Sequence, residues 1–310
     1  MSLFSQWWPW SEQAETKTGF ILALGGGGGR GLAHIGVLEV LEEHSLVPDA
    51  IIGTSIGALF GAMYAVNPSA NQMKKRTLDY LRSEPFKRVN LPVIQEADRQ
   101  DESWLARFVA LAKQTVLYTR AATDLAILDD DALFEVADLF TDSRDFCDAR
   151  IPMYVTAVEF PGGECRIFSC DENVPMDRAI AASMAIPGVF APVEIEGHQY
   201  VDGGLASEIP AREARMLAND EQLVVAVNVG ARPAKDQLPA NVYGMLDWSS
   251  QIKSLYLRRY EKQYADLVVE PLVGHTQWHD FSRPDEEIAK GREAMRNVLP
   301  RLAERLRHNG

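Results

Sequence analysis

Short apolar runs and longer segments with helical spacing alternate along this chain. Residues 20–24 and 50–53 are short and apolar, which is typical of buried strands. Residues 32–43 repeat apolar side chains at the spacing of a helix, with glutamates between them. Residues 55–66 are small and apolar on most faces, so they predict a helix buried in the core.

The rest of the chain continues this alternation. Residues 69–140 look mainly helical and carry many charges. Further strands are predicted at 153–160, 166–169, 193–195, 199–201, 223–229 and 267–269, and further helices at 241–262 and 284–307. This order predicts an α/β fold with helices on both faces of a mostly parallel sheet. We expect one domain over residues 19–310, with a helical insertion at about 69–140 and C-terminal helices at about 241–310.

Charge and cysteine usage exclude several classes of protein. The chain has 31 Lys and Arg against 44 Asp and Glu, a formal net charge of −13. No nucleic acid partner is expected, because phosphate backbones require a basic footprint, and charge alone would not dock the protein on anionic lipid. Cys147, Cys165 and Cys170 are too few for a disulfide framework and form no CxxC motif. We expect no metal, no cofactor and a reducing compartment.

The N-terminal tail, residues 1–18, carries three tryptophans at positions 7, 8 and 10. Indole rings favour membrane interfaces, so the tail is a candidate anchor; the alternative is that it packs into a groove of its own domain or of a partner. The first charged residue is Glu12, and no apolar run is long enough to span a bilayer. We expect a cytoplasmic protein that can contact the inner membrane peripherally. The oligomeric state stays open.

Five consecutive glycines, residues 25–29, separate the first predicted strand from the first helix. Glycine costs backbone entropy, so such a run needs a reason, and close approach of backbone amides to an anion at a helix start is one. Gly26, Gly28 and Gly31 fit a dinucleotide fingerprint, whereas the same amides could form an oxyanion hole, and a tight turn is a third interpretation. A dinucleotide site also needs an acidic residue after the second strand, which this chain lacks there.

Residues 53–57 read Gly-Thr-Ser-Ile-Gly and match the nucleophile-elbow pattern G-x-S-x-G. The match lies between a predicted strand and a buried helix, which is the context that this motif requires. Gly53 and Gly57 permit the sharp turn, and Ser55 would lie where the helix dipole favours a developing anion. Ser55 is therefore the candidate nucleophile; the alternative is a simple helix N-cap.

A serine nucleophile needs a base, and the chain offers histidines and one well-placed aspartate. Asp202 ends a predicted strand and is followed by Gly203 and Gly204, so its carboxylate can approach another loop closely. Taken alone, this Asp-Gly-Gly could also be a hairpin turn. None of the six histidines lies in a motif; they are His34, His44, His198, His275, His279 and His308.

Together these motifs resemble the patatin-like phospholipases, in particular bacterial members of the neuropathy-target-esterase-like subgroup. Residues 24–38 resemble the oxyanion segment, 53–57 the nucleophile elbow and 202–204 the D-G-G/A motif, and 179–192 resemble the segment that leads into it. After that motif the family usually has asparagine before proline, whereas this chain has Ser-Glu-Ile-Pro at 207–210.

The resemblance implies a three-layer α/β/α fold and a Ser–Asp dyad without a catalytic histidine. Ser55 would be the nucleophile and Asp202 the base. The implied oxyanion hole comprises Gly26, Gly27, Gly28, Gly29, Arg30 and Gly31. The side chain of Arg30 could brace the loop, bind a lipid phosphate or form a surface ion pair. The expected function is a serine acyl hydrolase acting on lipid or acyl-ester substrates. The alternatives are a non-catalytic adaptor on the same scaffold and a dinucleotide-binding protein.

Overall fold

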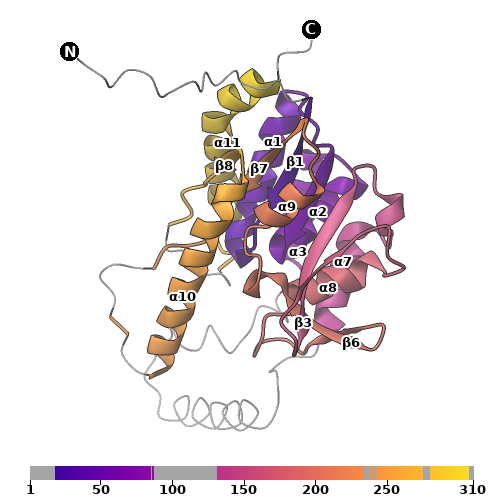
Figure 1. The fold of residues 1–310 in the computed structure, drawn as a ribbon, viewed down its shortest axis with the longest axis vertical. Coiled ribbons are helices and arrows are strands. Elements are labelled where there is room, and N and C mark those ends of the chain that lie inside the picture. Colours follow the sequence, from indigo (N-terminus) through magenta and orange to yellow (C-terminus); the bar gives the residue numbers. More distant parts are fainter. Residues whose placement is uncertain are drawn as a thin grey trace, which may run out of the picture.

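The computed structural model describes residues 18–84, 86, 131–233, 238–239, 242–274 and 280–306. Its strands form a single mixed sheet in the order β5-β6-β3-β2-β1-β7-β8, with β4 paired to β3 (Figure 1). The parallel part comprises β1 (Gly19–Leu24), β2 (Ala50–Thr54), β3 (Met153–Phe160), β7 (Gln222–Val227) and β8 (Leu267–Val269). The antiparallel part adds β4 (Cys165–Phe168), β5 (Val193–Ile195) and β6 (His198–Asp202) beside β3.

Helices cover both faces of the sheet, as the alternating pattern predicted. Leu22 and Leu24 of β1 point into the larger core, which involves α1 (Ala33–Glu43), α2 (Ile56–Val66), α3 (Ala70–Leu81), α7 (Asp131–Thr141), α8 (Met176–Met184) and α11 (Pro284–Leu306). Ile21 and Ala23 point to the opposite face, where α9 (Ala211–Leu217) packs. The long helix α10 (Val242–Glu261) runs beside this layer (Figure 1). The three-layer α/β/α prediction is therefore confirmed.

The central strands carry apolar side chains on both faces of the sheet. Helices can therefore pack against both faces. All six residues of β1 and all five of β2 are buried. Parallel strands need helical crossovers, and these crossovers supply the covering layers. The carboxyl ends of β1 and β2 consequently open onto the loops that begin η1 (Gly28–Leu32) and α2, where the glycine run and Ser55 lie.

Most of the predicted strands and helices are present within a residue or two, but two short helices were not predicted. Helix α8 and helix α9 contain too few residues to show a clear helical period. The tryptophan tail, most of the expected insertion, His275, His279 and His308 lie outside the described residues. Among the helices that the structure describes, none is long and apolar enough to cross a membrane.

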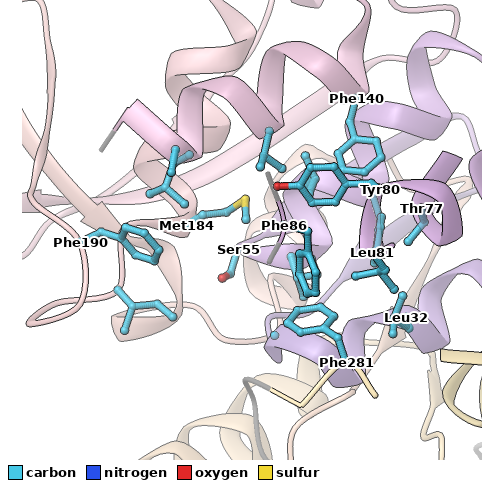
Figure 2. Close-up of a pocket in the computed structure, with 18 of the residues that line it drawn as sticks. Leu32, Ser55, Thr77, Tyr80, Leu81, Phe86, Phe140, Met184, Phe190 and Phe281 are labelled. Carbon is cyan, nitrogen blue, oxygen red and sulfur yellow. The ribbon is translucent and has the colours of Figure 1, made fainter. Parts of the chain in front are cut away.

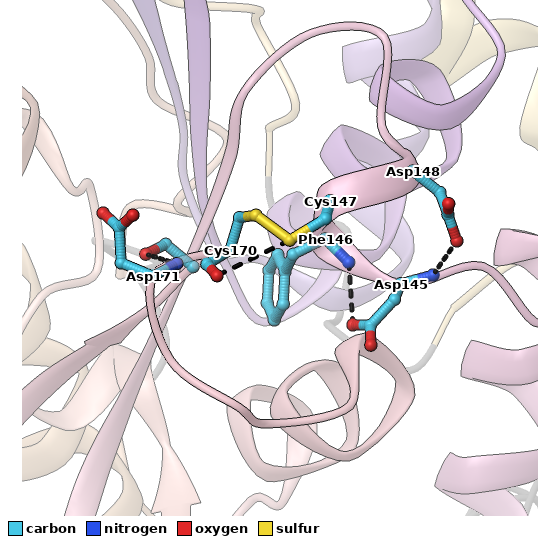
Figure 3. Close-up of a disulfide and its surroundings, with 7 residues drawn as sticks. Asp145, Phe146, Cys147, Asp148, Cys170 and Asp171 are labelled. Carbon is cyan, nitrogen blue, oxygen red and sulfur yellow. Dashed lines mark hydrogen bonds between the residues drawn. A yellow bond between two sulfur atoms is a disulfide. The ribbon is translucent and has the colours of Figure 1, made fainter.

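The structure joins Cys147 and Cys170 in a single disulfide, a pair that the sequence did not predict (Figure 3). The bond connects the short helix η2 (Phe146–Asp148) to the loop between β4 and α8, and both partners lie at the surface. The sequence could not show this pairing, since 23 positions separate the two cysteines and the fold brings their Cα atoms to 5.0 Å. Cys165 is the free thiol.

Candidate active site

Ser55 occupies the sharp turn between β2 and α2. Its backbone has φ 55° and ψ −125°, a left-handed conformation that residues with a side chain rarely adopt. The first turn of α2 packs closely against the end of β1. Gly57 allows this packing, because a Cβ atom at this position would lie 2.2 Å from the carbonyl oxygen of Leu24. The turn raises the Ser55 hydroxyl above the end of the sheet. Strain of this kind persists only where surrounding contacts hold it.

The carboxylate of Asp202 meets the hydroxyl of Ser55, although 147 positions separate them. Ser55 Oγ donates a 2.7 Å hydrogen bond to Asp202 Oδ2, and the backbone N–H of Gly204 donates a 2.7 Å bond to Oδ1. Asp202 ends β6, which pairs with β3, the neighbour of β2. The two side chains therefore come from strand ends on nearby strands of one sheet.

Burial changes the acidity of Asp202. Removal of the carboxylate from water raises its pKa to about 6, while the hydrogen bonds from Gly204 and Ser55 act in the opposite direction. A carboxylate with an ordinary pKa near 4 is a weak base at neutral pH. The raised pKa brings Asp202 closer to the range in which a general base works best.

The glycine run passes directly beside Ser55, but its amides are not equivalent. The Gly25 amide donates to Val227 O at 3.1 Å and the Gly26 amide to Glu208 O at 2.9 Å. The prediction that Gly26 donates to an oxyanion is therefore wrong, because its N–H is already used. The other predicted members, Gly27, Gly28, Gly29, Arg30 and Gly31, stay predictions. Gly28, with φ 58°, lines the same cavity as Ser55.

Arg30 and Gly31 also make contacts that support the loop. Arg30 Nε donates a 3.0 Å hydrogen bond to the carbonyl oxygen of Gly27. Burial lowers the pKa of Arg30 to about 10, and the nearby Glu208 partly opposes this shift. A Cβ atom at Gly31 would lie 2.4 Å from Ile56 Cγ2, so this glycine allows η1 to pack on α2. This bond to Gly27 is what the bracing alternative for Arg30 predicts, and the other two alternatives stay predictions.

The described histidines do not compete with Asp202. His34 is fully buried, its Nε2 lies 2.8 Å from Gly25 O, and burial lowers its pKa to about 4. His44 Nδ1 bonds Val40 O on its own helix, and His198 Nδ1 lies 3.0 Å from a carboxylate oxygen of Glu159. Over the described ranges, no group of three His, Cys, Asp or Glu side chains could hold a metal ion.

An apolar cavity of about 150 Å³ opens beside Ser55 (Figure 2). Four aromatic rings form one side of the cavity and contact one another edge to face, with ring centroids 5.3–5.6 Å apart. The contacts are Tyr80–Phe86, Tyr80–Phe140 and Phe86–Phe281. Phe190 lies on the other side of Ser55 in the same view, and Met184 lies next to Ser55. Apolar cavities of this size hold a molecule of benzene in other proteins. The cavity therefore suits a hydrocarbon chain that ends at Ser55.

The sequence profile of the patatin-like phospholipases matches residues 22–215, well over half of the chain. The chain belongs to the patatin-like phospholipase family. The matched part begins in β1 and ends in α9, so it contains the glycine run, Ser55 and Asp202. The family prediction made from the motifs is confirmed.

Named relatives agree with this membership. The chain is 29% identical over 243 residues to patatin-like phospholipase domain-containing protein 6 of Mus musculus, covering 76% of this chain and 15% of that protein. It is 29% identical over 223 residues to lysophospholipase NTE1 of Scheffersomyces stipitis, covering 72% of this chain and 12% of the relative. The chain thus spans only a small part of these relatives.

A solved structure shows the same fold. VipD from Legionella pneumophila superposes with a TM-score of 0.51 and 16% sequence identity, covering 92% of this chain and 67% of VipD. At this identity the likeness concerns the fold alone.

Several residues at the site were not found from the sequence. Ser183 bonds the backbone of Ser55, and Thr156 Oγ1 lies 2.7 Å from Thr54 Oγ1 in the strand end below it. Glu208 and Arg258, whose side chains are 12% and 5% exposed, form an ion pair behind the glycine loop. Each contact joins segments far apart in the chain, so no local pattern indicates it. The family-like stretch at 179–192 was the one available signal for Ser183.

Proposed function

We propose that the protein is a serine acyl hydrolase that cleaves carboxylic esters of lipids, with Ser55 as nucleophile and Asp202 as general base. The 2.7 Å hydrogen bond between these two side chains, beside a glycine loop and an apolar cavity, carries the proposal. Family membership supports a lipid substrate, and the name of the yeast relative supports lysophospholipids as one candidate class.

In the first half of the reaction, an ester carbonyl would lie between Ser55 Oγ and the amides of Gly27, Gly28 and Gly29. Ser55 Oγ would attack the carbonyl carbon while Asp202 Oδ2 takes the hydroxyl proton. The negative charge would form on the carbonyl oxygen, where the loop amides donate to it; each such donor is worth on the order of 10²–10³-fold in rate. Collapse of the intermediate would release the alcohol, which takes the proton from Asp202, and leave an acyl-serine.

In the second half, water would attack the acyl-serine carbonyl while Asp202 accepts a proton from that water. The oxyanion would again lie against the loop amides, and its collapse would return the proton to Ser55 and release the fatty acid. The acyl chain would occupy the apolar cavity throughout. A cavity of about 150 Å³ has room for about six carbon atoms, so the rest of a long chain would extend toward its opening.

A fluorophosphonate probe tests the nucleophile. We expect labelling of the wild-type protein at Ser55 and none of Ser55→Ala, while Ser69→Ala, which changes a helix N-cap serine at the start of α3, should label normally. Turnover of acyl esters of increasing chain length and of lysophospholipids, wild type against Ser55→Ala, then defines the substrate. An unlabelled wild-type protein with no turnover on the series would favour the non-catalytic adaptor.

The location of the enzyme is a separate proposal. The cytoplasmic location rested partly on cysteine usage, and the Cys147–Cys170 disulfide removes that part of its basis, because such bonds persist mainly in oxidising compartments. Alkylation of the protein in intact cells before lysis tests this point: modification of Cys147 and Cys170 restores the cytoplasmic assignment, and their protection contradicts it. Peripheral contact with a membrane stays a proposal that follows from the lipid substrate.

A further inference from the structure

The segment that ends α8 contacts both proposed catalytic residues. Ser183 Oγ accepts a 2.8 Å hydrogen bond from the backbone N–H of Ser55. Two residues later, the carbonyl oxygen of Ala185 accepts a 2.9 Å hydrogen bond from the backbone N–H of Asp202. One short stretch of chain thus holds the backbone of the nucleophile and that of its base.

The contact to Ser55 answers a specific need of the elbow. The first amides of a helix have no partner inside it, and the Ser55 amide lies at the start of α2. A buried amide without a partner costs free energy, and Ser55 also holds a left-handed φ of 55°. Ser183, which is fully buried, supplies the missing acceptor. A serine on a helix from elsewhere in the chain therefore stabilises the strained backbone that aims the Ser55 hydroxyl.

The same segment forms part of the cavity wall. Met184 lies between the two anchoring residues and lines the apolar cavity beside Ser55 (Figure 2). The position of the segment therefore determines where the acyl chain can lie as well as where the hydroxyl and the carboxylate lie. Small displacements at such a site are costly, since about 1 Å of misplacement can lower a rate about 10²-fold.

We propose that Ser183 is a positioning residue for the nucleophile and that residues 183–185 set the distance between Ser55 and Asp202. This inference rests on the proposed function. Ser183 touches no reacting atom; it acts through the Ser55 backbone.

The kinetic test compares Ser183→Ala with wild type. We expect kcat to fall at least tenfold with KM within about twofold of wild type, because the hydroxyl is misaimed while the cavity persists. The rate of fluorophosphonate labelling at Ser55 should fall by the same factor. The pH midpoint of activity should not fall, because a displaced Ser55 hydroxyl weakens the hydrogen bond that lowers the pKa of Asp202. Ser183→Thr keeps the hydroxyl and should regain most of the rate.

Ser169→Ala is the matched control. The Ser169 hydroxyl also accepts a hydrogen bond from a backbone amide. The donor is the N–H of Asp171, at 3.3 Å, in the loop between β4 and α8. This variant should leave kcat within twofold of wild type. If Ser183→Ala does not fold, Ser183→Cys replaces it, because a thiol is a weaker acceptor and should give an intermediate kcat.

Two results would overturn the inference: unchanged kcat in folded Ser183→Ala, or a loss of kcat that equals the loss of folded protein measured by circular dichroism. Amide hydrogen exchange makes the test independent of activity. Exchange at the Ser55 amide should rise at least tenfold in Ser183→Ala and stay constant in Ser169→Ala. Failure of the proposed function would show instead as absent labelling in wild type, whatever the exchange result.

Discussion

The backbone amide of Gly26 donates a 2.9 Å hydrogen bond to the carbonyl oxygen of Glu208, and this bond ties the glycine loop to the loop that follows Asp202. The side chain of Glu208 pairs with Arg258 of α10, which also donates a 2.6 Å bond to Ala231 O. Glu208 lies in the segment where the chain departs from the family pattern. The departure therefore coincides with an ion pair that anchors both active-site loops to α10.

Arg258→Met should destabilise the protein by about 3 kcal/mol, because the Glu208 carboxylate, whose side chain is only 12% exposed, loses its ion-pair partner. Adding Glu208→Gln removes that charge and should recover part of the loss. Urea unfolding measures both. The exposed pair Arg166–Glu172 is the control, and Arg166→Met should cost less than about 1 kcal/mol. If Arg258→Met and Arg166→Met lowered the unfolding free energy by the same small amount, the Glu208–Arg258 pair would contribute no more than the exposed pair.

The pH dependence of kcat/KM should report Asp202. Its pKa is raised to about 6, and only the deprotonated carboxylate can accept a proton, so activity should rise with pH and reach half its plateau near pH 6. Asp202→Asn should abolish this limb and lower kcat by about 10³-fold. Labelling of Asp202→Asn at the wild-type rate would contradict the assignment and direct attention to His275 and His279.

Glu261 should make the folded state less stable as pH rises. Burial raises its pKa from 4.5 to about 8, against a hydrogen bond from the Ile209 amide, so the folded protein keeps a proton that the unfolded chain releases. Its stabilising contribution is complete below pH 4.5 and is lost as pH rises through about 8.

Glu261→Gln stays neutral and keeps an acceptor for Ile209. Between pH 5 and pH 8 we expect this variant to gain on the order of 3 kcal/mol of unfolding free energy relative to wild type. Denaturant unfolding across that range measures the difference, and the exposed Glu164→Gln controls for net charge. Parallel stability curves for wild type and Glu261→Gln would disprove the effect.

The Cys147–Cys170 bond should stabilise the fold by about 3 kcal/mol, because it closes a loop across a separation of 23 positions. Cys147→Ala or mild reduction should therefore lower the thermal unfolding midpoint. Thiol titration of the denatured protein should find one free thiol before reduction and three after it. Cys165→Ala, which removes the free thiol, controls for the loss of a cysteine side chain. Three free thiols before reduction would exclude the bond.

The sequence by itself determined the layered α/β fold, the elbow and the family. Buried parallel strands are short apolar runs, and the glycines around Ser55 and along residues 25–29 follow from local backbone demands. Each such signal lies within one short stretch of the chain, which is why it can be recognised without coordinates. The interpretation of Asp202 over the histidines likewise depended on a local pattern of strand end and glycines.

Only the tertiary structure decided that the first amides of the glycine run are used in hydrogen bonds, how acidic Asp202 is, and what holds Ser55. The Gly26 amide is used by Glu208, the pKa of Asp202 is raised by burial, and Ser183 bonds Ser55 across 128 positions. The two cysteines join across 23 positions for the same reason. Hydrogen-bond pairing and desolvation depend on neighbours that folding brings together from distant parts of the chain, and no local spacing records those neighbours.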